Sequence, residues 1–266
     1  LHKNFLNLYR MKITLSRIIV TSFAMFSIFF GAGNFILPAF LGRAAGEHWL
    51  LVSIAFCLSA VLIPILGVVV QARLQGSVLD FGKKVSSFVS ILLGCLLYGM
   101  CLAFPMPRTA SVSYEMISAT FAPNLPAWVM YTFYVFYFFL VGYLCFQRNK
   151  ILDVLGKYLT PLMVGIILLL IIVAIFNQGD ITISSFENPI AEGLLEGYQT
   201  YDAMSSIIIG GVIVASLALD NSFDKRQVKR LTIYAGIGSG ILLFITYAGF
   251  IYTGASQGSY FPEVDQ

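Results

Sequence analysis

Long runs without Asp, Glu, Lys, Arg or His are the feature that most constrains how this chain can fold. They cover residues 18–42, 49–72, 85–107, 116–147, 158–179, 203–219 and 231–262. A helix needs about 20 apolar residues to cross the roughly 30 Å hydrocarbon core of a bilayer. Only 11% of the residues are charged, whereas a soluble domain carries about 25% because its surface faces water. The sequence therefore predicts an all-α integral membrane protein, and argues against a soluble enzyme or a nucleic-acid-binding module.

Two local features divide these runs into seven predicted spans. The run 116–147 contains a proline-rich loop at 123–126, and Asp202 shortens the run that begins at 203. The predicted spans are 18–42, 49–72, 86–118, 127–147, 154–176, 193–218 and 230–254. The chain thus divides into an N-terminal segment at 1–17, a transmembrane domain at 18–254 and the start of an outer loop at 255–266.

The lysines and arginines predict the orientation of the spans. All but two of the 16 lie on one side, in the segments 1–17, 73–84, 148–157 and 219–230. Short loops rich in Lys and Arg stay in the cytoplasm, so the N-terminus is predicted to be cytoplasmic. The sequence pI near 8.6 therefore reports membrane orientation rather than an acidic partner.

The four cysteines lie inside apolar runs and there are two histidines, so neither a disulfide framework nor a metal cluster is indicated.

The first and sixth spans are predicted to be broken near their middles. The first contains Gly31, Gly33, Asn34 and Pro38, and the sixth contains glycine and polar residues just before Asp202. Counted from the cytoplasmic ends, both weak points lie roughly 20–25 Å from the inner face at 1.5 Å per residue. Interrupted spans at matching positions favour a transporter built from five-helix inverted repeats. The second repeat is incomplete here, because only two of its helices are present.

Each of these features also has a structural alternative. Small residues allow close helix packing in membranes, which is the preferred interpretation of Gly236, Gly238 and Gly240. A water-lined vestibule is the alternative for Asp202, but a carboxylate inside a span costs about 2.5–3.5 kcal/mol, which favours a functional role. Arg108 and Glu115 are spaced to share one helix face, and a structural pair is at least as well supported there as a substrate role.

Four motifs, in this order, resemble the bacterial branched-chain amino acid carriers, also called leucine/isoleucine/valine:cation symporters of the amino acid–polyamine–organocation superfamily. The motifs are Phe30 to Pro38, Ala45 to His48, Pro107 to Glu115, and Gly197 to Ala203. The resemblance covers about residues 12–260 and implies import of leucine, isoleucine or valine across the bacterial cytoplasmic membrane with Na⁺ or H⁺. Such carriers have about twelve spans, so this chain resembles their first seven and is not expected to catalyse coupled uptake alone. The family's usual Thr-Met-Asp is Thr200-Tyr201-Asp202 here.

The resemblance also implies the site residues. The substrate-binding set is Gly31, Ala32, Gly33, Thr200, Asp202 and Ser205, with the amides of Ala32 and Gly33 on the substrate carboxylate. The Na⁺ set is Ser27, Phe29, Phe30 and Asn34. The physics agrees, since a half-helix N-terminus attracts anions and a half-helix C-terminus presents carbonyl oxygens to cations. No organic cofactor is implied, and the expected partners are the substrate, the coupling ion and the lipid bilayer.

Other functions remain as alternatives. A carrier of the same fold for another small neutral amino acid, or an inactive truncated carrier, has the same sequence features. A seven-span receptor has its N-terminus outside, contrary to the charge pattern. An aspartyl intramembrane protease needs a second aspartate in a span, and a serine type needs a histidine there; the sequence offers neither. A Gly-x-x-x-x-Gly-Lys loop is also lacking, so direct use of ATP is not supported.

Overall fold

The computed structural model describes residues 13–121, 126–146, 155–177, 179–219 and 223–257, and within these ranges every regular element is helical. Parts of the predicted end segments (1–12 and 258–266) and of the loop at 123–126 lie outside the described residues. The helices are α2 (Leu15–Phe29), α3 (Ala32–Ala45), η1 (Gly46–His48), α4 (Trp49–Cys57), η2 (Leu58–Leu62), α5 (Ile63–Leu74), α6 (Val78–Gly82), α7 (Ser87–Ala103), α8 (Pro105–Phe121), α9 (Ala127–Cys145), η3 (Leu155–Leu159), α11 (Thr160–Phe176), α12 (Pro189–Tyr198), α13 (Asp202–Leu219) and α14 (Lys225–Gln257). The predicted all-α class is confirmed.

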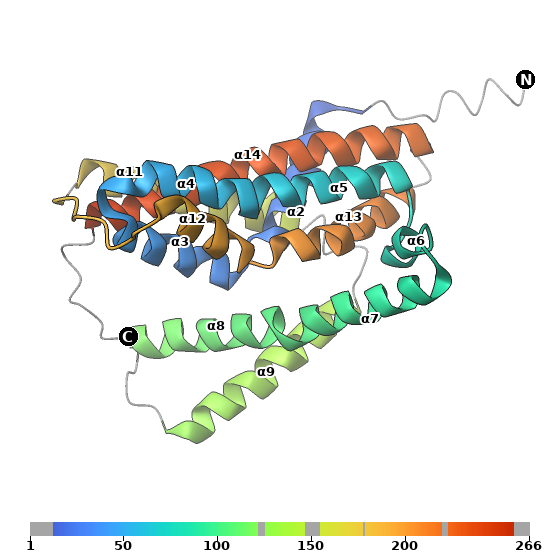
Figure 1. Ribbon diagram of the computed structural model, residues 1–266. Helices are drawn as coiled ribbons and strands as arrows, with labels where there is room; N and C mark the ends of the chain where they lie inside the picture. Colours follow the sequence, from blue (N-terminus) through green and yellow to red (C-terminus); the bar gives the residue numbers. More distant parts are fainter. Residues whose placement is uncertain (1–12, 122–125, 147–154, 178, 220–222, 258–266) are drawn as a thin grey trace, which may run out of the picture.

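Among the described residues, six helical segments are long and apolar enough to cross a membrane, and α2 is a shorter apolar helix. One of the six, Gly33–Leu74, has 42 residues, about twice what one crossing needs. It turns back on itself at Gly46, which has a positive φ of 48° and begins the short helix η1. Figure 1 shows α3 running toward this turn and α4–α5 running away from it. The six segments therefore contain parts of all seven predicted spans.

The outer surface of the bundle is strongly apolar, as expected for contact with lipid. None of the most apolar stretch of α9 is buried inside the protein, and its surface carries Tyr131, Phe136 and Phe139, each more than 60% exposed. Exposed apolar area of this extent is far beyond what a soluble monomer shows. These side chains lie on helices of spanning length, which is the pattern of a multi-pass membrane protein.

Helix α14 is the packing centre of the bundle. Its backbone approaches α3 so closely that a Cβ at Gly42 would collide with the Ile251 carbonyl oxygen, and one at Gly254 would collide with the Ala39 carbonyl oxygen. Near the middle of α14, a Cβ at Gly238 would collide with the Ser22 hydroxyl of α2. Small residues permit such approach in membranes.

Three glycines in the middle of α14 test the packing interpretation directly. A Cβ at Gly236, Gly238 or Gly240 would lie against side chains of α5 or α2. The prediction that these glycines serve helix packing is confirmed.

The third predicted span, 86–118, is two helices rather than one. Helix α7 ends at Ala103, Phe104 has φ −112° and ψ −65°, and α8 begins at Pro105. Proline has no N–H to donate and disfavours helical geometry in the residue before it, which accounts for the irregularity. In Figure 1, α7, α8 and α9 form a layer beside the main bundle.

A short helix, α6, lies in the predicted cytoplasmic segment 73–84. Ser77 and Asp80 form a reciprocal capping box at its start, which satisfies two backbone N–H groups that a helix start leaves unpaired. The pKa of Asp80 is held below its ordinary value, mainly by hydrogen bonds from the Ser77 backbone N–H and hydroxyl and to a smaller extent by the nearby Lys83.

Candidate functional site

The first span is broken immediately before the predicted Gly31–Asn34 motif. Helix α2 ends at Phe29, Phe30 leaves helical geometry with ψ 88°, and Gly31 is extended with φ −92° and ψ 173°. The Gly31 N–H donates to the Phe29 carbonyl over 3.0 Å, and the Asn34 N–H donates to the Gly31 carbonyl over 3.0 Å. The predicted break is confirmed, and it leaves the start of α3 facing into the bundle at mid-span.

The sixth span is broken at Gln199, Thr200 and Tyr201. Helix α12 ends at Tyr198 and α13 begins at Asp202. Tyr201 has a left-handed φ of 60°, an unusual conformation for an aromatic residue. The Thr200 hydroxyl donates to the Gly197 carbonyl over 2.8 Å and accepts from the Asp202 N–H over 3.4 Å. This prediction is also confirmed, and the break places Asp202 in the first turn of α13.

A buried hydrogen-bonded network joins the two breaks. The Asn34 amide Nδ2 lies 2.9 Å from the Asp202 Oδ2, 2.9 Å from the Phe29 carbonyl and 2.8 Å from the Tyr247 hydroxyl. The Tyr247 hydroxyl in turn donates to the Asp202 Oδ2 over 3.2 Å. Asn34, Asp202 and Tyr247 are 6%, 5% and 0% exposed. One side chain from each of α3, α13 and α14 therefore meets at a single buried point.

The electrostatics of this network leave the Asp202 carboxylate without a positive side-chain partner. Within the described ranges, no Lys, Arg or His nitrogen lies within ion-pair distance of Asp202. Its contacts are instead with neutral donors, and a buried carboxylate without a positive partner is unfavourable. The arrangement is chemically suited to hold a proton or a cation beside a ring of neutral oxygen and amide groups.

The other predicted site residues are placed as follows. The Phe29 carbonyl takes part in the network, and the Phe30 ring stacks 5.2 Å from Phe26 and 6.1 Å from Tyr247. The Ser27 hydroxyl donates back to the Ala24 carbonyl over 2.8 Å within α2. The Ser205 N–H donates to the Tyr201 carbonyl over 3.0 Å at the start of α13.

The glycines of the motif differ in their surroundings. A Cβ at Gly31 would meet open space, whereas one at Gly33 would lie 3.0 Å from the Arg108 guanidinium carbon. The side chain of Ala32 lies outside the described part of the structure. The structure thus brings Phe29, Asn34 and Asp202 into contact.

Two residues near the breaks were not assigned to the site from the sequence. Tyr247 gives no signal in the sequence, because a tyrosine in an apolar span is most simply a packing residue. Arg108 was paired with Glu115, but Glu115 accepts instead from the Ser111 hydroxyl over 3.1 Å, and Arg108 makes no ion pair with a described residue. The expected pair is therefore absent, and Arg108 lies at the first break.

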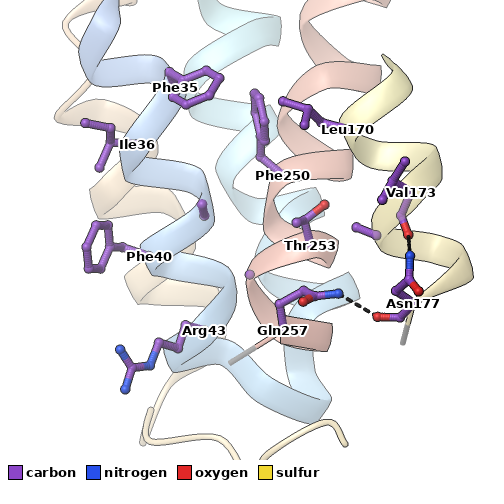
Figure 2. Close-up of a pocket in the computed structure, with 13 residues that line it drawn as sticks. Phe35, Ile36, Phe40, Arg43, Leu170, Val173, Asn177, Phe250, Thr253 and Gln257 are labelled. Atoms are coloured by element: carbon purple, nitrogen blue, oxygen red, sulfur yellow. Dashed lines mark hydrogen bonds between the residues drawn. The ribbon is translucent and has the colours of Figure 1, made fainter. Parts of the chain in front are cut away.

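A separate cavity of about 810 Å³ lies between α3, α11 and α14. Figure 2 shows its largely apolar lining, with Arg43, Asn177 and Gln257 gathered at one end. There the Gln257 Nε2 donates to the Asn177 carbonyl over 2.6 Å. None of the predicted site residues lines this cavity, although Phe35 follows Asn34 directly and packs edge-on against Phe250 at 4.9 Å.

Fold and site together define an all-helical, multi-pass membrane protein with two broken helices that meet at a buried polar network. Residues 14–266 match the family model described as branched-chain amino acid transport protein, so the chain belongs to this family. The family is one of transporters rather than enzymes.

Curated relatives agree with the family. The chain is 32% identical over 246 residues to the branched-chain amino acid permease BraB of Bacillus subtilis, an alignment that covers 90% of this chain and 55% of the relative. It is 33% identical over 243 residues to a protein of Staphylococcus haemolyticus provisionally named as a branched-chain amino acid carrier, covering 87% and 54%. The chain thus spans about half the length of these relatives. No solved structure matches it.

Proposed function

We propose that this chain belongs to a secondary active transporter that imports leucine, isoleucine and valine across the bacterial cytoplasmic membrane, coupled to Na⁺ or H⁺. The observation that carries the proposal is the 2.9 Å hydrogen bond between Asn34 and Asp202, which joins the breaks of the first and sixth spans. Broken spans near the membrane midplane are where transporters of this type bind substrate and coupling ions. Family membership supports the substrate class.

The proposed architecture is a five-helix inverted repeat, with seven spans present and a cytoplasmic N-terminus. Breaks in the first and sixth spans support it, because they occupy equivalent positions five helices apart. The alternation of basic and acidic connecting segments supports the orientation.

In the proposed site, the two breaks bind opposite ends of the substrate. The start of α3, with Gly31, Ala32 and Gly33, faces the substrate carboxylate, because the first N–H groups of a helix have no intrahelical partner. Asp202, with Thr200 and Ser205 beside it, bears on the substrate ammonium or the coupling cation. Two further groups complete the cation site: carbonyl oxygens from Ser27, Phe29 and Phe30, and the Asn34 side chain. To these Tyr247 is added, because it shares the Asp202 oxygen with Asn34.

A related carrier for another small neutral amino acid is the second candidate. Tyr201, which stands where the family usually has methionine, favours it, because a larger aromatic side chain at the break alters the space beside the substrate. Competition among leucine, valine, alanine and phenylalanine for binding distinguishes the two candidates. An inactive chain is the third, and it predicts no binding of any of these.

The decisive experiment is leucine uptake into proteoliposomes, with and without a Na⁺ or pH gradient, by a full-length carrier that contains this chain. Asp202→Asn retains the shape and removes the charge, so it should lower apparent affinity or abolish ion dependence while expression is retained. Glu187→Gln, the corresponding loss of charge at an exposed residue of the segment between α11 and α12, should leave uptake unchanged.

Gly33→Leu tests the other break in the same assay. The added side chain would enter the space held by the Arg108 guanidinium, and should abolish uptake without blocking membrane insertion. Normal kinetics and ion dependence in both Gly33→Leu and Asp202→Asn would refute the broken-helix site.

A further inference from the structure

One arginine of the third span lies directly against the first break. The carbon and two nitrogens of the Arg108 guanidinium lie 3.0, 3.1 and 3.4 Å from the position that a Cβ would have at Gly33. A side chain at that position would displace the guanidinium, so the glycine is what allows an arginine from α8 to reach the start of α3.

The same face of the third span also reaches the second break. Arg108 follows Phe104 by one helical turn, and the Arg108 N–H donates to the Phe104 carbonyl over 3.2 Å. The Phe104 ring stacks on Tyr201, with ring centroids 6.0 Å apart and planes 24° apart. Phe104, at the junction of α7 and α8, and Arg108, one turn further along, thus contact the two breaks separately, and this part of the third span forms a third wall of the site.

The charge at this wall is unbalanced. Arg108 makes no ion pair with any described carboxylate, and its electrostatic interaction with Glu196 of α12 acts beyond ion-pair distance. The guanidinium instead lies beside the start of α3, where unpaired N–H groups already give a partial positive charge. Two positive groups held side by side are stabilised by an anion between them. The buried Asp202 carboxylate is not that anion, because it accepts hydrogen bonds from Asn34 and Tyr247 instead.

We infer that Arg108 binds the carboxylate of the transported amino acid, together with the amides at the start of α3. The inference rests on the proposed function and deepens it by naming the residue that selects an α-amino acid over the corresponding amine. A guanidinium suits this task because its planar fork matches both oxygens of a carboxylate. The substrate ammonium then lies toward Asp202, so the opposite charges of the two walls fix the direction in which the zwitterion binds.

The first test is chemical protection of a full-length carrier that contains this chain, solubilised in detergent. Arg108 and Arg73 are both exposed, so phenylglyoxal should modify both, and mass spectrometry of the two peptides measures each separately. Leucine should slow the modification of Arg108 and leave Arg73 unaffected. Leucinamide and isoamylamine, which lack the carboxylate, should protect neither arginine.

The second test is direct binding of labelled leucine to Arg108→Gln, Arg108→Lys and the control Arg73→Gln. Arg108→Gln should weaken leucine binding about tenfold or more, since a charge-assisted bidentate bond is lost, while weak competition by leucinamide stays unchanged. Arg108→Lys should recover part of the loss because it keeps the charge without the fork.

The outcomes separate this inference from the proposed function. Leucine binding by the wild-type chain with an unprotected Arg108 overturns the inference alone. Equal weakening of leucine and leucinamide binding in Arg108→Gln also overturns it, and assigns Arg108 to a contact with α12. A full-length carrier that contains this chain and binds no branched-chain amino acid overturns the proposed function and this inference with it.

Discussion

Replacing Tyr247 with phenylalanine removes one oxygen atom from the centre of the network and leaves the ring in place. The ring packs edge-on against Phe56 at 5.2 Å and stacks on Phe30 at 6.1 Å, and both contacts remain in the variant. What is lost is the 3.2 Å hydrogen bond to the Asp202 carboxylate and the 2.8 Å acceptor for Asn34. The change therefore isolates the polar part of the interaction.

The expected size of the effect comes from those two bonds. A hydrogen bond to a charged group contributes about 1.5–3 kcal/mol and a neutral one about 0.5–1.5 kcal/mol. The bond to Asp202 is long, and Asn34 retains the Phe29 carbonyl and Asp202 as alternative acceptors. We therefore expect Tyr247→Phe to lower the free energy of unfolding by about 1–3 kcal/mol, a factor of roughly 5 to 150 in the folding equilibrium.

Reversible unfolding in mixed micelles, with increasing SDS and helical circular dichroism as the signal, measures this difference. Tyr252→Phe is the matched control on the same helix: its ring packs on Trp49 at 5.0 Å, and its hydroxyl has no hydrogen-bond partner among the described residues. The control should unfold like the wild type. Equal stabilities of the two variants would refute the claim that the Tyr247 hydroxyl holds the two breaks together.

Three further predictions concern packing, topology and pH. Gly254→Ala should destabilise the bundle by about 1–3 kcal/mol, because α14 touches the α3 backbone at this glycine. Gly165→Ala, whose added methyl group would meet open space, should be neutral in the same SDS titration. Similar losses of stability in the two variants would contradict the backbone contact. A cysteine at position 84 on a cysteine-free background should be labelled from the cytoplasm only, and labelling from outside in intact cells would overturn the orientation. The pKa of Asp80 is held below its ordinary value of 3.8, so the stabilisation of α6 by Asp80 is complete above pH 3.8 and is lost as the pH falls through the lower folded-state pKa. Hydrogen exchange in α6 should accelerate over that fall in pH in the wild type but not in Asp80→Asn. Identical pH profiles of hydrogen exchange in the two proteins would contradict the capping role.

The broken spans could be predicted because their signals are local. Gly31, Gly33 and Asn34 are poor helix formers inside an apolar run, and the structure breaks within one residue of them. The second break falls within the predicted stretch, at Gln199 to Tyr201 and directly before Asp202. Gly197, at the start of the same stretch, lies inside α12, and a Cβ there would lie 2.6 Å from the Phe56 carbonyl oxygen, so this glycine serves packing.

Contacts between distant segments could not be predicted from local patterns. Tyr247 is 45 residues from Asp202, and only the packing of α14 brings the two together. The Arg108–Glu115 pair was expected from helical spacing alone, which says which face a residue occupies but not which neighbour that face meets. The predicted roles of the substrate and Na⁺ residues stay predictions, since they concern ligands rather than the fold.

The two breaks differ in what supports them from behind. Both halves of the first span pack on one uninterrupted helix: α2 meets α14 at Gly238 and α3 meets it at Gly254, along 33 residues, or about 50 Å. The two halves of the sixth span pack on the second span, α12 on α4 and α13 on α5. The π-helical turn η2 lies between α4 and α5, and such turns are frequent sites of helix bending. A change of angle at Gly31 would have to bend one continuous α-helix, whereas a change at Thr200 would act on a helix that is already interrupted by a π-helical turn. We therefore expect the two breaks to resist bending unequally.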